Sequence, residues 1–570
     1  MINEKKNLPI KNITIWVGAG VSINAPSRLP SGNELTEFAF TNMIIGKDRF
    51  LEIWEKINTY EAKYCNMSVT KFPRLELLLS SIAYIEKFFM GKGSLRGNFL
   101  SGLNSFDEVP FNENHMLLAV LAHAGARIMT ANFDLGIERA YRVLYAEECS
   151  NIVHFHGTNQ SGDKIGATIE NVTHFVNKTI EHKIESSFYY KRSNYFFGYS
   201  FSDMYDINAT IQRLYSDSNA SYTKDNWVCN HKGWDVGLEK KICNIFGKED
   251  NVHIDNAETT EALKKLCEKY FIVIPAQMEK KGENFANRKK WSELFLEKVE
   301  ITEEFKILSS IHFYNRMGIA VDKIDKQILE KYEQMEFEND KREILEYHLA
   351  ANSKYWYKRY GNSRLKTEYH KMALHKRQVS SKFEKDVQSR LSLHSVEQFI
   401  QNLKKRNFVM YEDFGELTER MHKIKYDLVK AKNYIDITDA RHLVDKISGY
   451  PVGKFIGIIL YASTYRYKML LEGVDGKDNC DSYKKANEIY YDIGNIDGIV
   501  STQLDYLLSQ NFKKDSNYWK MLFRKTMWEE LKSLCKVTGT YRYEQLMSRF
   551  EIIKGEMANG DNCSVSAPIS

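Results

Sequence analysis

Closely spaced cysteines are missing from this sequence. Its 570 residues contain eight cysteines, and no two of them lie within four residues of each other. That spacing excludes a CxxC zinc knuckle. The first residues carry charges but lack the apolar core of a signal peptide. Because scattered thiols in such a chain are typical of a reducing compartment, we expect a cytoplasmic protein.

Long apolar runs and a strong charge of one sign are also missing. No stretch approaches the roughly 20 apolar residues of a membrane span, so we expect no contact with a membrane. The 80 basic and 75 acidic side chains leave a formal charge of +5. This excess is too small to indicate a nucleic-acid partner. Hydrophobic residues make up 43% of the chain, which is ample for large cores.

Proline is scarce in the second half of the chain. Pro451 is the only proline between Pro275 and Pro568, and long segments place apolar residues at helical spacing between Lys and Glu. This pattern predicts an all-α, helical-repeat-like domain over residues 276–556 and a flexible tail over residues 557–570. The turn at 493–498, between two helical patterns, resembles that of a tetratricopeptide repeat.

The first half alternates strand-like and helix-like segments. Five short apolar runs read as strands, at 13–17, 126–130, 151–155, 195–197 and 226–230. Residues 271–275 are either a last strand or the end of a boundary segment. Strands that alternate with helices predict an α/β domain over residues 1–270, built on a Rossmann-like parallel sheet. A helical insertion is expected at about 52–112.

Glycine follows the first of these strands, in Gly18-Ala19-Gly20-Val21-Ser22. Glycines at this place let the backbone approach a pyrophosphate, whose charge backbone N–H groups can bind. The third glycine of the usual dinucleotide fingerprint is missing, because position 23 is Ile. Taken alone, the segment is equally well explained as a tight turn.

Polar side chains end the next two strands. Thr130-Ala131-Asn132-Phe133-Asp134 carries an amide that can bind a ribose or a water, and a carboxylate that can orient a carboxamide or stabilise positive charge. Asp134 also suits the N-cap of a following helix. His156 stands before a glycine, where a general base is useful. His154, inside the strand, is expected to be a packed histidine.

Together these segments resemble the sirtuin superfamily, which binds NAD. Residues 18–22 are similar to its GAGxS loop, residues 130–134 to its TQNxD motif, and His156-Gly157 to its catalytic His-Gly pair. Gly198-Tyr199-Ser200 is similar to its GTS segment, and Asn230 to an asparagine that serves the adenosine ribose. The resemblance covers about residues 10–235. It implies a sirtuin-like fold for this domain.

The chain also departs from the deacylase sirtuins. Their four-cysteine zinc module has no counterpart in the interval from Thr158 to Phe197, which lacks cysteine. Ala131 replaces the glutamine of TQNxD, and Ser31-Gly32-Asn33 replaces Asp-Phe-Arg. These differences make the domain similar to the zinc-free, NAD-destroying sirtuin-like domains of bacterial anti-phage effectors. No zinc is expected.

The resemblance implies roles for individual residues in NAD hydrolysis to ADP-ribose and nicotinamide. Asn132 would place water and ribose, Asp134 would contact the carboxamide, and His156 would assist as a base. The NAD-binding residues would be Gly18, Ala19, Gly20, Ser22, Thr130, Gly198, Ser200 and Asn230.

Other functions remain open at this point. The alternatives are a zinc-free NAD-dependent protein deacylase, a non-catalytic sensor of NAD or ADP-ribose, and an inert scaffold whose helices bind partners. Because an unregulated NAD hydrolase would kill its host in abortive infection, we expect gating by the helical half. The trigger would be a phage protein, a nucleotide signal or a partner subunit, acting on a homo-oligomer or a complex.

Overall fold

The computed structural model describes most of the first 336 residues and several helical stretches after them. The described residues are 9–65, 70–88, 99–159, 165–168, 178–189, 191–201, 207–216, 222–233, 237–275, 289–336, 435–448, 458–510 and 525–539, with single positions between 417 and 427. The predicted tail at 557–570 lies outside them. Within the described residues, no helix is both long enough and apolar enough to cross a membrane.

A six-stranded, all-parallel sheet forms the centre of the first half, in the order β3-β2-β1-β4-β5-β6. This order is that of a Rossmann-like fold, so the predicted parallel α/β sheet is confirmed. The strands are β1 (Ile13–Val17), β2 (Arg127–Thr130), β3 (Ile152–His154), β4 (Ser193–Phe197), β5 (Asn226–Cys229) and β6 (His253–Asp255). Residues 271–275 form no strand, and the last strand is β6 instead.

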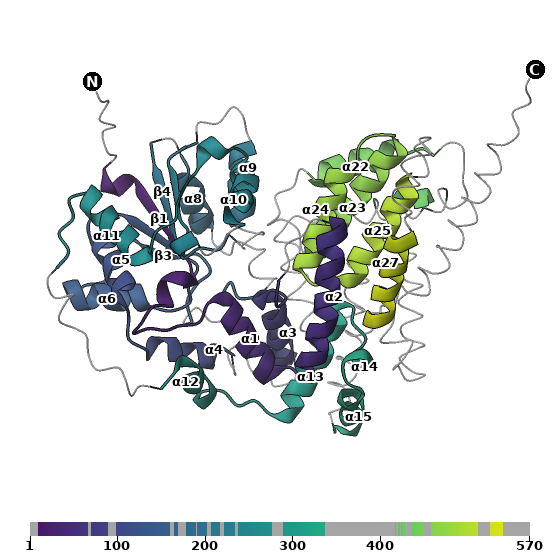
Figure 1. Ribbon diagram of the computed structural model, residues 1–570, viewed down its shortest axis with the longest axis horizontal. Coiled ribbons are helices and arrows are strands. Elements are labelled where there is room, and N and C mark those ends of the chain that lie inside the picture. Colours follow the sequence, from purple (N-terminus) through teal and green to yellow (C-terminus); the bar gives the residue numbers. More distant parts are fainter. Residues whose placement is uncertain are drawn as a thin grey trace, which may run out of the picture. The chain divides into compact units, whose positions relative to one another are not determined.

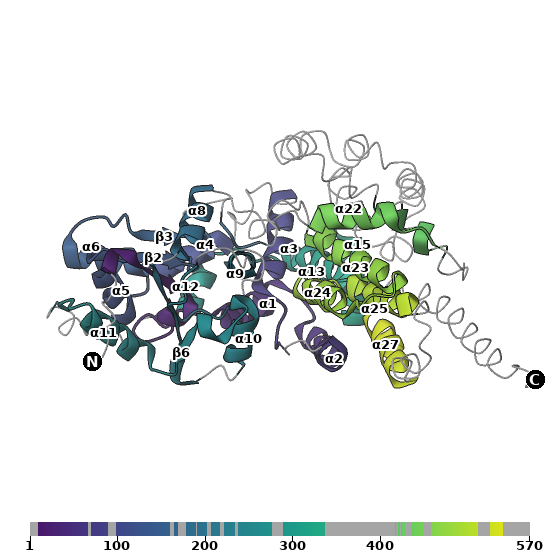
Figure 2. The same ribbon diagram turned by 90° about the horizontal axis from the view of Figure 1, so that it is seen from above.

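Helices cover both faces of the sheet (Figures 1 and 2). One face packs against α5 (Glu113–His123), α6 (Gly136–Tyr145) and α11 (Thr259–Lys269), and the other against α8 (Lys178–Ser187), α9 (Ile207–Ser216) and α10 (Leu238–Phe246). Buried strands between two helical layers are apolar on both sides, which explains the continuous apolar runs in the sequence.

Strand β1 contributes side chains to the cores on both faces of the sheet, as Trp16 shows. Its neighbours Ile15 and Val17 belong to the core under α5 and α6, whereas Trp16 points into the opposite core. Its ring stacks on Phe196 with centroids 5.7 Å apart. The indole N–H donates to Oδ1 of Asn194 at 2.9 Å, so a polar group buried in this layer keeps a partner.

The chain divides into two compact units, each built from two stretches of sequence. The first unit contains 1–42 and 78–302, and the second contains 43–77 and 303–570. The first unit also includes α4 (Phe99–Leu103), α12 (Trp291–Glu297) and most of α1 (Gly32–Met43) and α3 (Leu75–Phe88). The segment predicted as a helical insertion at 52–112 is mostly helical where it is described, and its first part belongs to the second unit.

The second unit is a helical region. Its described helices are α2 (Lys47–Cys65), α13 (Glu303–Met317), α14 (Val321–Ile324), α15 (Lys326–Gln334), α22 (Thr438–Ser448), α23 (Ile458–Val474), α24 (Cys480–Asp492), α25 (Ile496–Gln510) and α27 (Lys525–Thr538). Gly494, at φ 63°, ends α24 in the left-handed conformation that glycine adopts readily. The turn thus lies where the sequence indicated it.

Helix α2 is an integral part of this second unit. The Trp54 ring stacks on Tyr491 of α24, with centroids 5.4 Å apart. The Tyr491 hydroxyl donates to Asn58, and Lys63 forms an ion pair of 2.6 Å with Glu530 of α27. A cut near residue 275 would therefore separate α2 from the helices that it packs against.

A buried carboxylate joins two cations within the second unit. Oδ2 of Asp505, on α25, lies 2.6 Å from Nε of Arg466 on α23 and 2.5 Å from Nζ of Lys425. The Asp505 side chain is only 1% exposed. Removing one member of such a group leaves an uncompensated charge in the interior, which costs more than the pair itself contributes.

We predict that Asp505→Asn lowers the free energy of unfolding of this unit by about 3–5 kcal/mol, because both cations lose their counter-ion. Urea unfolding of the full chain, followed by fluorescence, measures the change. The control is Asp439→Asn, which removes an exposed partner of Arg420 and should change little. Equal effects of the two substitutions would contradict the prediction.

Candidate functional site

Every segment predicted to take part in the NAD site lies at or just after the end of a strand. Because the strands are parallel, their carboxyl ends meet at one edge, where ligands of such sheets bind. The connections reverse direction between the neighbouring strands β1 and β4, which marks the topological switch point. The segments are 18–22 after β1, 130–134 at the end of β2, 156–157 after β3, 198–200 after β4 and Asn230 after β5.

The glycines hold the loops after β1 and β4 against each other. The N–H of Gly18 donates to the carbonyl of Phe197, and that of Gly20 to the carbonyl of Gly198, both at 3.1 Å. A Cβ on Gly18 would lie 2.4 Å from the oxygen of Gly198, and Gly198 itself has φ 58°. Side chains at these positions would push the loops apart. The two amides are already used within the chain.

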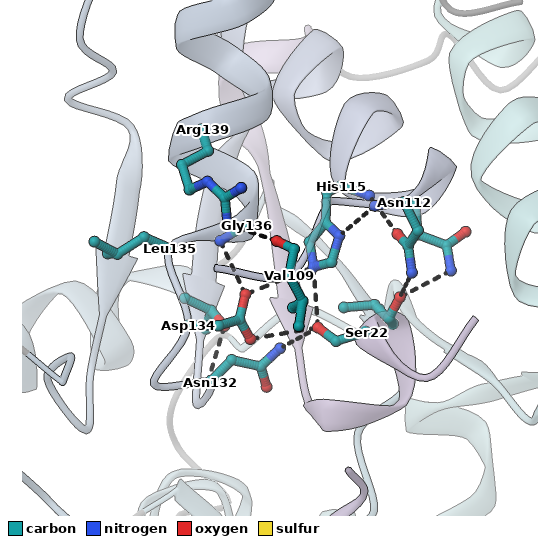
Figure 3. Close-up of polar contacts among 12 residues, drawn as sticks. Ser22, Val109, Asn112, His115, Asn132, Asp134, Leu135, Gly136 and Arg139 are labelled. Atoms are coloured by element: carbon teal, nitrogen blue, oxygen red, sulfur yellow. Dashed lines mark hydrogen bonds and ion pairs between the residues drawn. The ribbon is translucent and has the colours of Figure 1, made fainter. Parts of the chain in front are cut away.

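The hydroxyl of Ser22 connects three side chains at this edge (Figure 3). Its oxygen lies 2.9 Å from Nε2 of His115, accepts from Nδ2 of Asn132 at 3.3 Å, and donates to Oδ2 of Asp134 at 3.4 Å. Ser22 is 1% exposed. With one proton and two acceptor positions, the hydroxyl is fully engaged by these partners.

His115 is the member of this network that sequence reasoning missed. Its Nδ1 accepts the N–H of Asn112 at 3.1 Å, so the ring proton is on Nε2, which donates to Ser22. Burial lowers the pKa of His115 despite Asp134 at 3.6 Å, and the ring is neutral. The available signal was the capping-box spacing of Asn112 and His115 at the start of α5.

Asn132 and Asp134 occupy the turn between β2 and α6. Oδ1 of Asp134 accepts the N–H of Gly136, the first residue of α6, at 2.9 Å, although the N-cap of this helix is Leu135 rather than Asp134. The main-chain N–H of Asn132 donates to Oγ1 of Thr130 at 3.1 Å. Figure 3 shows the amide nitrogen of Asn132 directed at Ser22 and its oxygen turned away from the network.

The other predicted residues reach the same edge through separate contacts. His156 packs its ring edge-on against Phe155, with centroids 4.6 Å apart. Ser200 is exposed, and its carbonyl accepts from Nζ of Lys241. The N–H of Asn230 donates to the carbonyl of Asp255 at 2.9 Å. The network itself thus unites Ser22, Thr130, Asn132 and Asp134 of the predicted set.

Metal ligands do not gather in the part of the chain that the structure describes. No group of three or more His, Cys, Asp or Glu side chains is placed there to hold a metal ion. Cys149, Cys229, Cys243, Cys267, Cys480 and Cys535 are free thiols. Since part of the interval 158–197 lies outside the described residues, the zinc-free site stays a prediction.

We predict that His115→Phe lowers the stability of the first unit by about 2–4 kcal/mol, because Ser22 and the Asn112 N–H both lose a buried partner. Differential scanning calorimetry of the full chain measures the loss. Because the folded ring binds its proton less readily than the unfolded one, wild-type stability also falls as pH drops below about 6.5. The Phe variant should lose part of this acid sensitivity.

His123→Phe is the matched control, since His123 lies at the other end of α5 and is largely exposed. It should leave the melting temperature and its pH dependence nearly unchanged. An unchanged melting temperature for His115→Phe would mean that the network does not contribute to folding.

Comparisons with protein-family models, with curated proteins and with solved structures return no match for this chain.

Proposed function

We propose that this chain is a zinc-free, sirtuin-like NAD⁺ hydrolase that cleaves the bond between nicotinamide and ribose. The observation that carries the proposal is the position of Asn132. Its amide is fixed by Ser22 at the carboxyl edge of the sheet, beside the switch point, with the oxygen turned away as an acceptor. That edge is where open α/β sheets bind dinucleotides.

The proposed reaction breaks the bond between C1′ of the ribose and N1 of the nicotinamide. The bonding electron pair goes to N1, which becomes neutral, and positive charge develops on the ribose as in glycoside hydrolysis. The oxygen of a water molecule bonds to C1′, and its proton passes to His156. The products are ADP-ribose, nicotinamide and one proton.

Asn132 and Asp134 have complementary parts in this proposal. The Asn132 oxygen accepts a hydrogen bond from the attacking water or from a ribose hydroxyl, which orients the reacting groups. Both oxygens of Asp134 already accept hydrogen bonds, from Gly136 and Ser22. Each oxygen keeps a further acceptor position, so this buried carboxylate would contact the carboxamide or stabilise the positive charge on the ribose.

The remaining residues are assigned to the rest of the dinucleotide. Gly18, Gly20 and Gly198 let the pyrophosphate approach the two loops closely. The N–H groups of Gly18 and Gly20 already bond within the chain. Ala19 and the exposed Ser200 supply contacts to phosphate. Thr130 accepts the main-chain N–H of Asn132, and Asn230, just after β5, serves the adenosine ribose.

We further propose that the enzyme depletes cellular NAD as a cytoplasmic anti-phage effector, and that the helical unit gates it. Helical repeats form extended surfaces suited to binding a trigger. The trigger would be a phage protein, a nucleotide signal or a partner subunit that assembles the chain into an active oligomer. A pull-down from infected cells with an inactive full-length variant tests this gating. Recovery of no ligand that stimulates the wild-type enzyme would contradict it.

We predict that Asn132→Ala and His156→Ala each lower nicotinamide release by at least ~100-fold, because positioning and general-base groups typically contribute that much. Chromatography of the products from NAD alone measures the rate, and thermal melting checks the fold. The control is Asn151→Ala, whose amide bonds the carbonyl of Ala122 at the opposite end of the sheet. It should retain wild-type activity.

The need for an acylated peptide, and the occurrence of cleavage itself, separate this proposal from the alternatives. Nicotinamide released from NAD without any acylated peptide supports hydrolysis. A strict need for an acylated peptide would make the chain a deacylase. NAD binding without cleavage, in the presence of every candidate trigger, would make it a sensor.

A further inference from the structure

His154 makes two short polar contacts, one with the main chain of Asn132 and one with Glu138. It is the last residue of β3 and pairs in register with Thr130 of β2. Its Nδ1 lies 2.7 Å from the main-chain oxygen of Asn132, and its Nε2 lies 2.6 Å from Oε1 of Glu138 on α6. The His154 side chain is 10% exposed and that of Glu138 is 16% exposed. The ring is therefore a link between two elements rather than simple core packing.

These contacts determine where the protons are. A carbonyl oxygen only accepts hydrogen bonds, so Nδ1 must carry a proton. An ionised carboxylate also only accepts, so Nε2 must carry a second proton. With both nitrogens protonated, His154 is an imidazolium paired with the Glu138 carboxylate.

The surroundings favour the charged pair. Burial by itself lowers the pKa of His154, but the hydrogen bond and charge of Glu138, the Asn132 carbonyl and the charge of Asp134 outweigh it, and the pKa is raised. Glu138 lies in the first turn of α6, where the helix dipole favours a negative charge. Its Oε2 is buried without a hydrogen-bond partner in the described structure. Glu138 thus depends on His154 for its counter-charge.

We propose that His154 is a positioning residue, whose imidazolium, held by Glu138, fixes the main chain of Asn132 for NAD cleavage. The inference rests on the proposed function for its catalytic part. Asn132 is then held by three contacts: its N–H by Thr130, its carbonyl by His154 and its side-chain amide by Ser22. Loss of the carbonyl contact lets the turn at 131–135 move, and the amide oxygen loses its place.

Deprotonation should release this contact. A neutral ring has one proton for two acceptors, so one nitrogen would present its lone pair to either the Asn132 carbonyl or the Glu138 carboxylate. Because the folded pKa lies above the ordinary value, the contact is complete at lower pH and is lost as pH rises through the folded pKa. The expected signature is an alkaline decline in kcat.

Two substitutions at His154 separate positioning from mere packing. The side-chain nitrogen of Asn takes about the position of Nδ1 of the histidine ring, whereas that of Gln takes about the position of Nε2. His154→Asn can still donate to the Asn132 carbonyl, and should keep kcat within about threefold of wild type. His154→Gln keeps only the contact with Glu138 and loses the contact with the Asn132 carbonyl. It should lower kcat at least ~10-fold with little change in KM.

Substitution of Glu138 tests the charge. In Glu138→Gln, the new amide can donate to Nε2 of a neutral ring, so Nδ1 keeps its proton and its contact at high pH. The alkaline decline of kcat should disappear in this variant and in His154→Asn. The control is Glu147→Gln, which alters the exposed pair of His123 and Glu147 just beyond α6. It should keep the wild-type pH profile.

Amide hydrogen exchange of residues 130–136 in the full chain provides a test that needs no NAD. His154→Gln should speed exchange in this peptide, and His154→Asn should not. Unchanged exchange in both variants, or an alkaline decline retained in Glu138→Gln, would overturn the positioning role. Absence of NAD cleavage in the wild type would instead overturn the proposed function, while the exchange result would still decide whether His154 holds the turn.

Discussion

The close contact between the loops after β1 and β4 is the constraint on which the site depends. Main-chain atoms of Gly18 and Gly20 touch those of Gly198 so closely that a single added carbon would collide. That contact fixes where the 3₁₀ turn Ala19–Ser22 begins, and hence where Ser22 enters the sheet edge. The glycines therefore act first by shaping the protein. Any contribution to phosphate binding follows from that shape.

Ser22 hydrogen-bonds to His115, Asn132 and Asp134 at the edge of the sheet. In a buried setting an unmade hydrogen bond costs more than a made one contributes, so the network behaves as a unit. The two histidines illustrate this. His115 accepts a main-chain N–H and stays neutral, whereas His154 faces a carbonyl and a carboxylate and holds a positive charge. Burial lowers the pKa of His115, whereas at His154 the partners outweigh burial and raise the pKa.

Much of the first half could be predicted from the sequence because its strands are buried on both faces. Runs such as Ile13–Val17 are buried throughout, are apolar apart from Thr14, and end in glycine or polar turns. Strand β6, His253–Asp255, was not predicted. It is an edge strand with exposed His253 and Asp255, and so its sequence lacks an apolar pattern. For residues 271–275 the sequence left a last strand and a boundary segment open, and they form no strand because Phe271 is apolar but 92% exposed.

The site was predictable only as far as local motifs reach. Ser22, Asn132 and Asp134 follow strands and could be expected to converge, because parallel strands share one carboxyl edge. His115 enters from the start of α5, and the role of His154 depends on Glu138, a residue on a different element. Such partners become visible only when the elements are packed. For the same reason the division into units could not be read from composition, since 43–77 joins helices that lie hundreds of residues later.

The two histidines also set opposite limits on the pH range in which the edge is ordered. Protonation of His115 would place a second proton where Nδ1 now accepts the N–H of Asn112, so the network loosens as the medium becomes acidic. Deprotonation of His154 removes a proton from a ring that needs two, so the turn loosens as the medium becomes alkaline. Asn132 is linked to His115 through Ser22, and to His154 through its own main-chain carbonyl. Its geometry is therefore complete only between the acidic titration of His115 and the more alkaline titration of His154.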